Sequence, residues 1–228
     1  MGEEILRMEK IDKSFPGVHA LDHVDFDLKR GEVHALMGEN GAGKSTLMKV
    51  LTGIYQKDSG KITYQGREVN YHSTREAQAD GIVIVHQELN MVGDLTVAQN
   101  ILIGREFMHG PTIDDKKMIM ESRKLFERLK IDIDPSARMK DLTVGKQQMC
   151  EIAKAISHEC KVIVFDEPSA ALTEKEIDDL FAIIRDLRKQ DLGIIYISHR
   201  MDEIKVITDR VTVMRDGTYV GTLITKDC

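Results

Sequence analysis

The sequence predicts an α/β fold with a mostly parallel sheet, an antiparallel β region at the N-terminus and an inserted helical region. Three observations support this prediction. Apolar strand patterns alternate with amphipathic helix patterns, an order that places parallel strands in one sheet with helices on it. A glycine-rich loop joins one of these strands to the helix that follows. Residues 96–158 contain helix patterns alone, so we expect them to be an insertion.

The first strands are expected at the N-terminus. Residues 5–11, 24–28 and 33–37 are rich in β-forming side chains, and residues 61–66 alternate like an edge strand of a hairpin. Between them, residues 47–53 have the apolar spacing of a helix.

Further strands and helices are expected between residues 73 and 157. Residues 73–80 begin with a serine that is typical of a helix N-cap, and residues 81–87 have the pattern of a buried strand. Three amphipathic helices are then expected, at residues 96–107, 114–130 and 145–157.

In the last part of the chain, strand patterns again alternate with a helix pattern. Strands are expected at residues 162–165 and 193–199, with a long helix at 173–190 between them. Residues 209–224 predict a hairpin that turns at Asp216-Gly217. The core of the domain is therefore assigned to about residues 1–95 and 159–228, and the helical region to about 96–158.

Composition narrows the class of protein. Charged residues make up 31% of the 228 residues and the net charge is -6, which argues against a protein that binds nucleic acid by neutralising phosphates. Cys150, Cys160 and Cys228 are too few and too scattered for a disulfide framework or a zinc site. We expect no signal peptide, because the first residues have mixed charges and no apolar stretch, and no apolar run approaches the roughly 18 residues that span a bilayer. We expect a cytosolic soluble protein that reaches a membrane only through a partner.

The glycine-rich loop matches G-x-x-x-x-G-K-[ST]. In this motif the glycines let the backbone wrap phosphates, Lys44 supplies a positive charge, and the Ser45 hydroxyl can bind Mg²⁺. The alternative is a simple glycine turn, but the apolar strand before the loop and the helix after it favour phosphate binding. The expected phosphate-binding residues are Gly38, Glu39, Asn40, Gly41, Ala42, Gly43, Lys44, Ser45 and Thr46.

Two carboxylates follow the apolar run VIVF. Asp166 and Glu167 are expected at the carboxyl edge of the sheet, where α/β proteins bind ligands. Asp166 is a candidate to hold Mg²⁺ through its water shell, and Glu167 is a candidate to orient and polarise an attacking water. The alternative, an acidic helix N-cap after a strand, is common, but the nearby glycine loop favours the functional interpretation.

Three further side chains are weaker candidates. His199 ends a predicted strand, where its ring could reach a phosphate, although most single histidines are surface or capping residues. Gln87 is a candidate ligand for Mg²⁺ or water, the alternative being a solvated strand end. Phe15 could stack on an adenine, although a phenylalanine is more often part of the core.

Together these residues resemble the ATP-binding cassette domain, a P-loop NTPase, over essentially the whole chain. In this resemblance the glycine loop is Walker A, VIVFDEP contains Walker B, and Gln87, His199 and Phe15 fall at the Q-loop, the switch histidine and the A-loop. LTVGKQQ at residues 142–148 lies where the family signature LSGGQ is found, about 20 residues before Walker B.

The resemblance implies a mechanism with ATP and Mg²⁺. Lys44 and Ser45 would hold the β- and γ-phosphates and the metal, Glu167 would activate water, and Gln87 and His199 would position the γ-phosphate and the metal. A second cassette, a tandem half or another copy, would face this one head to tail.

Thr143 and Gly145 would then contact the nucleotide of the facing cassette. Lys146 stands where glutamine is usual in the family; it either adds charge near that phosphate or points into solvent, and we favour solvent.

Finer motifs are similar to the ATPase subunits of bacterial monosaccharide importers. They are FPGVHAL, VHQELN, LTVAQNI and EPSAALTEKE. Those subunits usually carry two cassettes, so the chain is expected to be a truncated N-terminal half.

The resemblance implies a peripheral position on the cytoplasmic side of the membrane. The implied partners are permease subunits, reached through about residues 88–105, and indirectly a sugar-binding protein outside the cell. An ATPase acting on ribosomes or DNA, and a regulatory module without turnover, are the alternatives; the acidic balance disfavours the first, and Glu167 and His199 disfavour the second.

Overall fold

The computed structural model describes residues 2–227, which form two compact units. The first unit contains the chain up to Ile84, Cys160–Glu167 and the chain from Ile184 onward. The second unit contains Val85–Glu159 and Pro168–Ile183. Helix α6 (Glu174–Lys189) therefore begins in the second unit and ends in the first.

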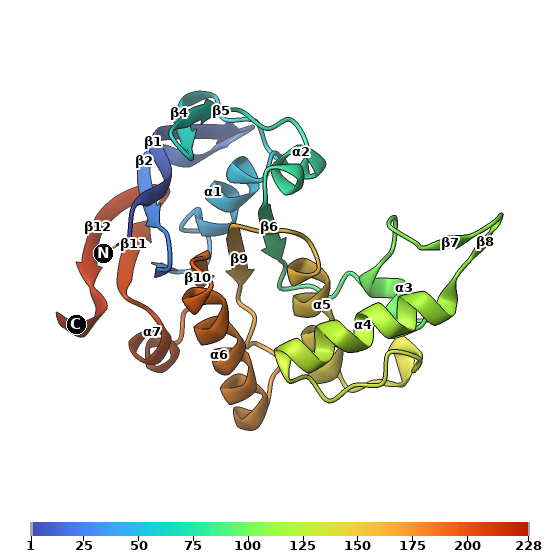
Figure 1. Cartoon of the computed structure of the whole chain (residues 1–228). Coiled ribbons are helices and arrows are strands. Elements are labelled where there is room, and N and C mark those ends of the chain that lie inside the picture. Colours follow the sequence, from blue (N-terminus) through green and yellow to red (C-terminus); the bar gives the residue numbers. More distant parts are fainter. Residues whose placement is uncertain (1, 228) are drawn as a thin grey trace. The chain divides into compact units, whose positions relative to one another are not determined.

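A ten-stranded sheet organises the first unit (Figure 1). Its strands, in spatial order, are β5 (Arg67–Val69), β4 (Ser59–Tyr64), β1 (Glu4–Phe15), β2 (Val18–Lys29), β12 (Thr218–Ile224), β11 (Arg210–Arg215), β3 (Val33–Met37), β10 (Gly193–Ile197), β9 (Val162–Asp166) and β6 (Ile82–Val85).

The predicted fold class is confirmed. Strands β11, β3, β10 and β9 pair in parallel, whereas β1, β2, β4 and β5 pair antiparallel at the N-terminal end. The two parts of the sheet are joined where Thr218 pairs with Asp22.

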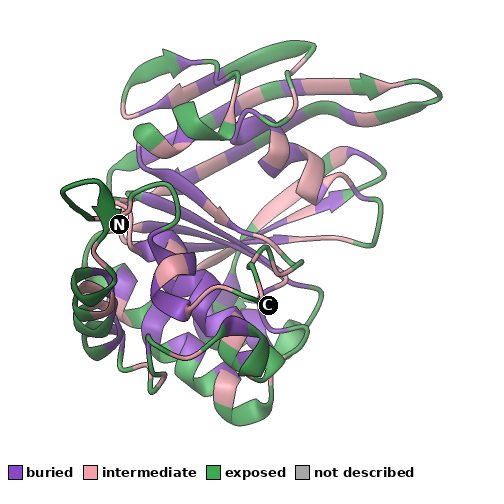
Figure 2. Ribbon diagram, turned by 90° about the vertical axis from the view of Figure 1, so that its right-hand side faces the viewer, coloured by how far each residue is buried: buried purple, intermediate pink, exposed green. Residues whose placement is uncertain are grey.

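The central strands are short and buried along their whole length, as Figure 2 shows. Parallel strands require cover on both faces, and alternate side chains of β3 supply it. Leu36 packs in a cluster with α1 (Lys44–Leu51), whereas Ala35 packs on the other face with Ile204 of α7 (Met201–Ile207).

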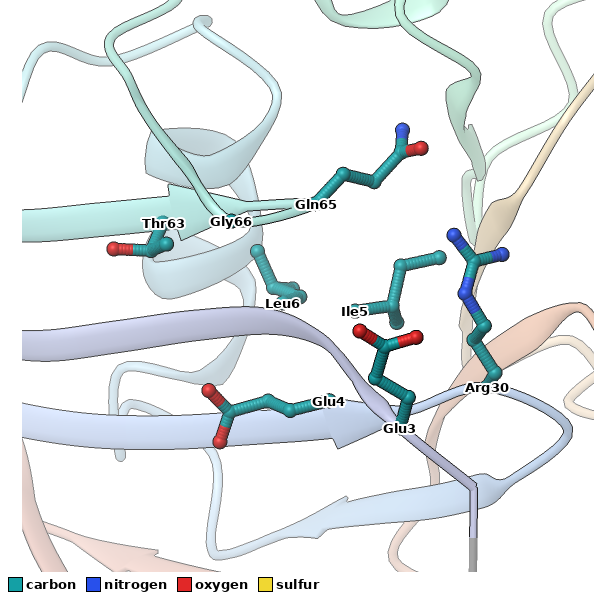
Figure 3. A pocket seen from close by; sticks show the side chains of 8 residues that line it. All are labelled: Glu3, Glu4, Ile5, Leu6, Arg30, Thr63, Gln65 and Gly66. Carbon is teal, nitrogen blue, oxygen red and sulfur yellow. The ribbon is translucent and has the colours of Figure 1, made fainter.

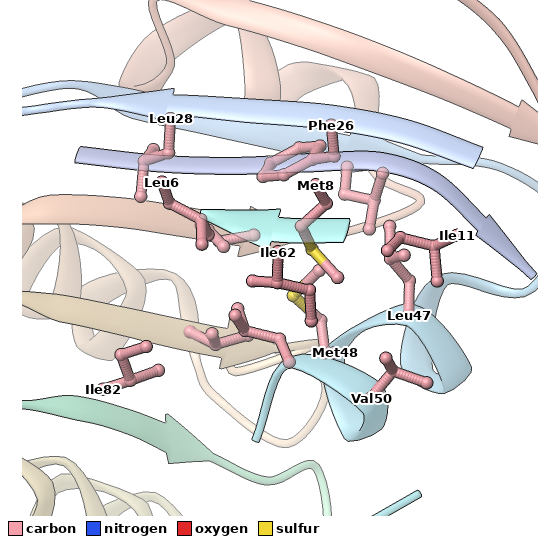
Figure 4. Close-up of a cluster of buried hydrophobic side chains, with 14 of the residues drawn as sticks. Leu6, Met8, Ile11, Phe26, Leu28, Leu47, Met48, Val50, Ile62 and Ile82 are labelled. Atoms are coloured by element: carbon pink, nitrogen blue, oxygen red, sulfur yellow. The ribbon is translucent and has the colours of Figure 1, made fainter. Parts of the chain in front are cut away.

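Helix α1 packs in the main hydrophobic core, together with strands of the sheet (Figure 4). Its residues Leu47 and Met48 are fully buried together with Met8 and Ile62 of the antiparallel strands and Val164 of the parallel ones. Burying side chains of this size contributes roughly 1.5–3 kcal/mol each. The helix that begins at the glycine-rich loop is therefore held from both parts of the sheet.

The first two strands are longer than the apolar runs predict. β1 and β2 have twelve residues each, and their outer ends pair Phe15 with Val18 around Gly17, whose φ is 82°. The added pairs join Lys13 with Leu21, Ser14 with His19 and Phe15 with Val18, so they mix polar and apolar residues and leave no continuous apolar run in the sequence.

The predicted hairpin at the end of the chain is confirmed. β11 and β12 are joined by Asp216 and Gly217, with φ values of 49° and 76°. Two successive left-handed residues form the turn that suits the twist of a hairpin. The predicted cap of α2 (Thr74–Ala79) is also present, because Ser73 Oγ accepts a hydrogen bond from the Glu76 N–H at 3.3 Å.

The second unit is helical. It contains α3 (Val97–Ile101), α4 (Asp115–Leu129), α5 (Val144–Ile156), the first part of α6 and a small hairpin of β7 (Met108–His109) and β8 (Thr112–Ile113) (Figure 1). Helix α3 contacts both α4 and α5. None of the helices in residues 2–227 is long and apolar enough to cross a membrane.

The helix expected at residues 96–107 is wrong beyond Ile101. Thr96 and Gln99 form a reciprocal capping box that starts α3, as the sequence allows. The helix then ends early, because Gly104 adopts a left-handed φ of 77° and Arg105 donates hydrogen bonds to the Ile101 carbonyl and to Ser157.

A buried histidine links β3 to its neighbours. His34 is fully buried, with Nδ1 2.7 Å from the Asp27 carbonyl oxygen and Nε2 2.8 Å from Thr212 Oγ1. Arg210 forms ion pairs with Asp27 and Glu32 beside it. Burial, followed by the charge of Arg210, lowers the pKa of His34 to about 4. The ring is therefore neutral at neutral pH.

Lowering the pH is expected to reduce the free energy of unfolding, because His34 is buried in its neutral form. The pKa is about 4 in the folded chain and about 6.5 in an unfolded one, so the unfolded chain binds the proton first. The contribution of His34 to the free energy of unfolding is therefore fully present above about pH 6.5 and is lost as the pH falls towards about 4. At about pH 5 the loss from this residue is about 2 kcal/mol.

Urea unfolding at about pH 8 and about pH 5 measures this contribution. Wild type should lose about 2 kcal/mol more stability between these conditions than His34→Gln. The exposed His109 supplies the control, since His109→Gln should keep the wild-type dependence. The same pH dependence in His34→Gln and wild type would contradict the assignment.

Candidate functional site

The glycine-rich loop joins β3 to α1 in a conformation that needs glycine at several positions. Gly41 and Gly43 have φ values of 86° and 97°, a region that other residues rarely adopt. A Cβ on Gly43 would lie 2.7 Å from the Ala20 carbonyl oxygen, and one on Gly38 would lie 2.4 Å from the Met214 carbonyl oxygen. The loop is therefore packed directly on the backbone of β2 and β11.

The loop presents free donors at the start of α1. The N–H groups of Lys44, Ser45 and Thr46 have no hydrogen-bond partner among residues 2–227, and no side chain caps the helix. Free N–H groups and the positive end of the helix dipole bind anions. The loop therefore fits a phosphate group.

Lys44 is held within the loop itself. Its side chain is 6% exposed, and Nζ donates hydrogen bonds to the carbonyl oxygens of Gly38 at 2.8 Å and Glu39 at 3.0 Å. The ammonium group is thus desolvated and positioned by the loop, ready to exchange a carbonyl for a phosphate oxygen.

Asp166 and Glu167 lie at the carboxyl end of β9, as predicted. Ser45 Oγ lies 3.5 Å from Asp166 Oδ1, so a hydroxyl and a carboxylate come together beside the phosphate loop. Oxygen ligands of this kind suit Mg²⁺. The two residues therefore fit the predicted metal site.

Glu167 has a strained backbone. Its φ is 48°, and its N–H donates a hydrogen bond to the Ile197 carbonyl at 3.0 Å. Its carboxylate Oε1 lies 3.4 Å from His199 Nδ1, and the His199 side chain is 63% exposed. Strained residues of this kind cluster at functional sites. The structure brings the predicted glutamate and histidine together.

The turn that carries His199 is anchored by a residue that sequence analysis missed. Glu203, on α7, is 4% exposed and accepts hydrogen bonds from Tyr196 at 2.8 Å and Ser198 at 3.1 Å. It also forms an ion pair with Arg200 at 2.7 Å. The Glu203 carboxylate therefore holds Ser198 and Arg200, the residues on both sides of His199. The position of Glu203 in the sequence, four residues after His199, does not by itself indicate this role.

Phe15 lies partly exposed at the end of β1. Its ring packs edge to face on Tyr55 with centroids 5.0 Å apart, and Lys13 Nζ lies 5.4 Å from its centroid. Base stacking by Phe15 stays a prediction.

Gln87, Thr143 and Gly145 belong to the second unit. Gln87 is exposed after β6. Thr143 is the N-cap of α5, and its Oγ1 accepts a hydrogen bond from the Lys146 N–H at 3.4 Å. The predicted helix start is confirmed, and the Lys146 side chain is exposed. Contact of these residues with a nucleotide stays a prediction.

Two pockets lie away from these residues, in the first unit. One of about 300 Å³ is bordered by Glu3, Arg30 and Gln65 (Figure 3). Another of about 500 Å³ lies between β1, β2 and β12 and includes Asp27 and Tyr219. Neither contains a predicted site residue. The Glu39–Gly41 part of the phosphate loop is instead exposed to solvent.

Residues 21–170 match a family described as ABC transporter. The chain is similar to the putative ribose/galactose/methyl galactoside import ATP-binding protein 2 of Burkholderia cenocepacia, at 55% identity over 99% of this chain. It is 52% identical, over 97% of its length, to the galactose/methyl galactoside import ATP-binding protein MglA of Escherichia coli K12. The chain spans 44% of the length of each of these curated relatives.

Solved structures are similar as well. The ADP conformation of MJ1267, an ATP-binding cassette of an ABC transporter, has a TM-score of 0.86 and 28% identity, covering 97% of this chain and 91% of that one. A nucleotide-free cassette from an ABC transporter has a TM-score of 0.85 and 28% identity, with 97% and 92% covered.

Substitution by alanine is expected to destabilise the fold more at Gly43 than at Gly41. Both substitutions put a side chain at positive φ, which costs about 1–2 kcal/mol. Gly41 faces open space, whereas Gly43 faces the Ala20 backbone and Leu21. Urea unfolding should show a loss of about 1 kcal/mol for Gly41→Ala and at least about 3 kcal/mol for Gly43→Ala. Equal losses would mean that the contact with β2 does not constrain the loop.

Proposed function

The chain belongs to the ABC transporter family, and from this premise we propose that it binds and hydrolyses ATP to power import of a monosaccharide through a membrane permease. The observation that carries the proposal is the convergence of Lys44, Ser45 and Asp166 at the phosphate loop, with Glu167 and His199 beside them. These are the group types that phosphoryl transfer to water requires.

Each residue has a distinct part in the proposed reaction. The N–H groups of Lys44, Ser45 and Thr46 and the Lys44 ammonium hold phosphate oxygens. Ser45 and Asp166 would hold Mg²⁺, which would neutralise charge on the phosphates when bound. Glu167 accepts a proton from the attacking water, and His199, 3.4 Å from it, orients that carboxylate and the γ-phosphate.

The second unit supplies the remaining groups of the proposed reaction. Gln87 acts as a ligand of the metal or of water. Thr143 and Gly145 act on the nucleotide bound by a second cassette, either a tandem half or another copy of this chain.

Sugar import is favoured over action on ribosomes or DNA. Relatives that are 52–55% identical are named for ribose and galactose import, and the net charge of -6 does not favour nucleic acid. The expected permease surface, about residues 88–105, exposes Val92 by 47% and Ile103 by 44%, apolar groups that a partner can cover. Capture of a permease rather than ribosomes or DNA in a pull-down separates the two functions.

Glu167→Gln is expected to abolish turnover but not binding. The amide cannot accept the proton from water, so the ATPase rate should fall at least about 100-fold while MgATP affinity changes little. Steady-state phosphate release and equilibrium nucleotide binding measure the two effects. The exposed Glu127 on α4 provides the control, since Glu127→Gln should keep the wild-type rate. An unchanged rate in Glu167→Gln would refute catalysis by this residue.

The ATPase rate of the chain is expected to depend on its concentration. If Thr143 and Gly145 act on the nucleotide of a facing cassette, a dilute monomer binds ATP but hydrolyses it weakly. The rate per chain should therefore rise with protein concentration as copies associate, which phosphate release followed over a dilution series would show. A constant rate per chain down to the monomeric range, established by sedimentation, would contradict a shared site.

A further inference from the structure

A carboxylate in the second unit caps one helix and lies against the start of another. Glu176, in the first turn of α6, accepts hydrogen bonds at Oε2 from the Thr173 N–H at 2.9 Å and from Thr173 Oγ1 at 2.8 Å. Thr173 Oγ1 in turn accepts a hydrogen bond from the Glu176 N–H at 3.4 Å. This reciprocal pair is a capping box, and it fixes where the Glu176 side chain lies.

The other carboxylate oxygen faces Gly145 on α5. A Cβ on Gly145 would lie 2.1 Å from Glu176 Oε1 and 2.3 Å from its Cδ. Gly145 is buried, and its φ is outside the left-handed region. Its backbone conformation would therefore accept alanine, and the need for glycine comes from the space that the Glu176 carboxylate occupies.

The contact lies next to predicted site residues. Gly145 is in the first turn of α5, two residues after the N-cap Thr143. Thr173, which Glu176 caps, lies six residues after Glu167 in the chain. A negative group beside the N-terminal turn of α5 is also favourable for the helix dipole.

We propose that Glu176 is a positioning residue that holds the N-terminal turn of α5 against the capped start of α6. Through this contact it sets the orientation of Thr143 and Gly145, the groups that act on the nucleotide of a facing cassette. The proposal rests on the proposed function, and it adds a reason for the glycine of the signature that is independent of phosphate approach.

A double-mutant cycle in the ATPase reaction tests the positioning role. The chain would be assayed over concentrations that extrapolate to full association. Gly145→Ala pushes the carboxylate away and should lower kcat about tenfold, with little change in KM for MgATP because the phosphate loop is intact. Glu176→Ala should lower kcat similarly. The double variant should be no slower than Glu176→Ala, because the space for the methyl group is then free.

Two further variants separate positioning from charge. Glu176→Gln keeps an oxygen that can accept from the Thr173 N–H, so it should retain most of the wild-type kcat. Glu174 lies in the same first turn of α6, is exposed and provides the matched control. Glu174→Ala should keep the wild-type kcat. A double variant that loses the product of the two single effects, or equal losses in Glu174→Ala and Glu176→Ala, would overturn the proposal.

The same cycle in thermal unfolding tests the contact without ATP. Gly145→Ala should lower Tm by about 2–4 °C when Glu176 is present, and should leave it unchanged or raised in Glu176→Ala, since alanine is the better helix former. Equal Tm shifts in both backgrounds would overturn the contact, and Tm coupling without kcat coupling would overturn the positioning role. A wild-type chain without ATPase activity would instead refute the proposed function, while the Tm cycle would still decide the contact.

Discussion

The close packing of the phosphate loop against two other backbones is the constraint on which the site depends. The loop can lie on β11 and β2 only because Gly38 and Gly43 carry no side chain. This contact fixes the start of α1, and α1 in turn joins the two parts of the sheet in one core. With the loop in place, Lys44 is held by loop carbonyls and the first N–H groups of α1 stay free.

Glycines in the two units are required for different physical reasons. At Gly43 the nearest obstacle is the Ala20 carbonyl oxygen and the φ is positive, so a side chain there would both meet backbone and strain the chain. At Gly145 the obstacle is the end of a flexible side chain, Glu176, and the φ is ordinary. A substitution at Gly145 therefore displaces a contact rather than straining the chain, and its effect reaches the start of α6 through Thr173.

Local chemistry made much of this structure predictable. A few adjacent residues determine each of three local features, and all three are present: the glycine loop, the turn at Asp216-Gly217 and the start of α5 at Thr143. The early end of α3 was not predictable from periodicity, because a left-handed Gly104 overrides an apolar pattern that continues beyond it. The contact of Glu176 with Gly145 was not predictable from local patterns, because it joins residues that are distant in sequence.

The central claim is that each nucleotide is hydrolysed by residues from two facing cassettes, and mixing two inactive variants tests it most directly. Lys44→Ala removes the phosphate-binding charge from one copy, and Thr143→Trp blocks the α5 N-terminus of the other. Each variant alone should be nearly inactive. A mixture should hydrolyse ATP well above the sum of the separate rates, because a mixed dimer contains one intact pair of Lys44 and Thr143. A mixture that only matches this sum, while sedimentation shows mixed dimers, would contradict the account.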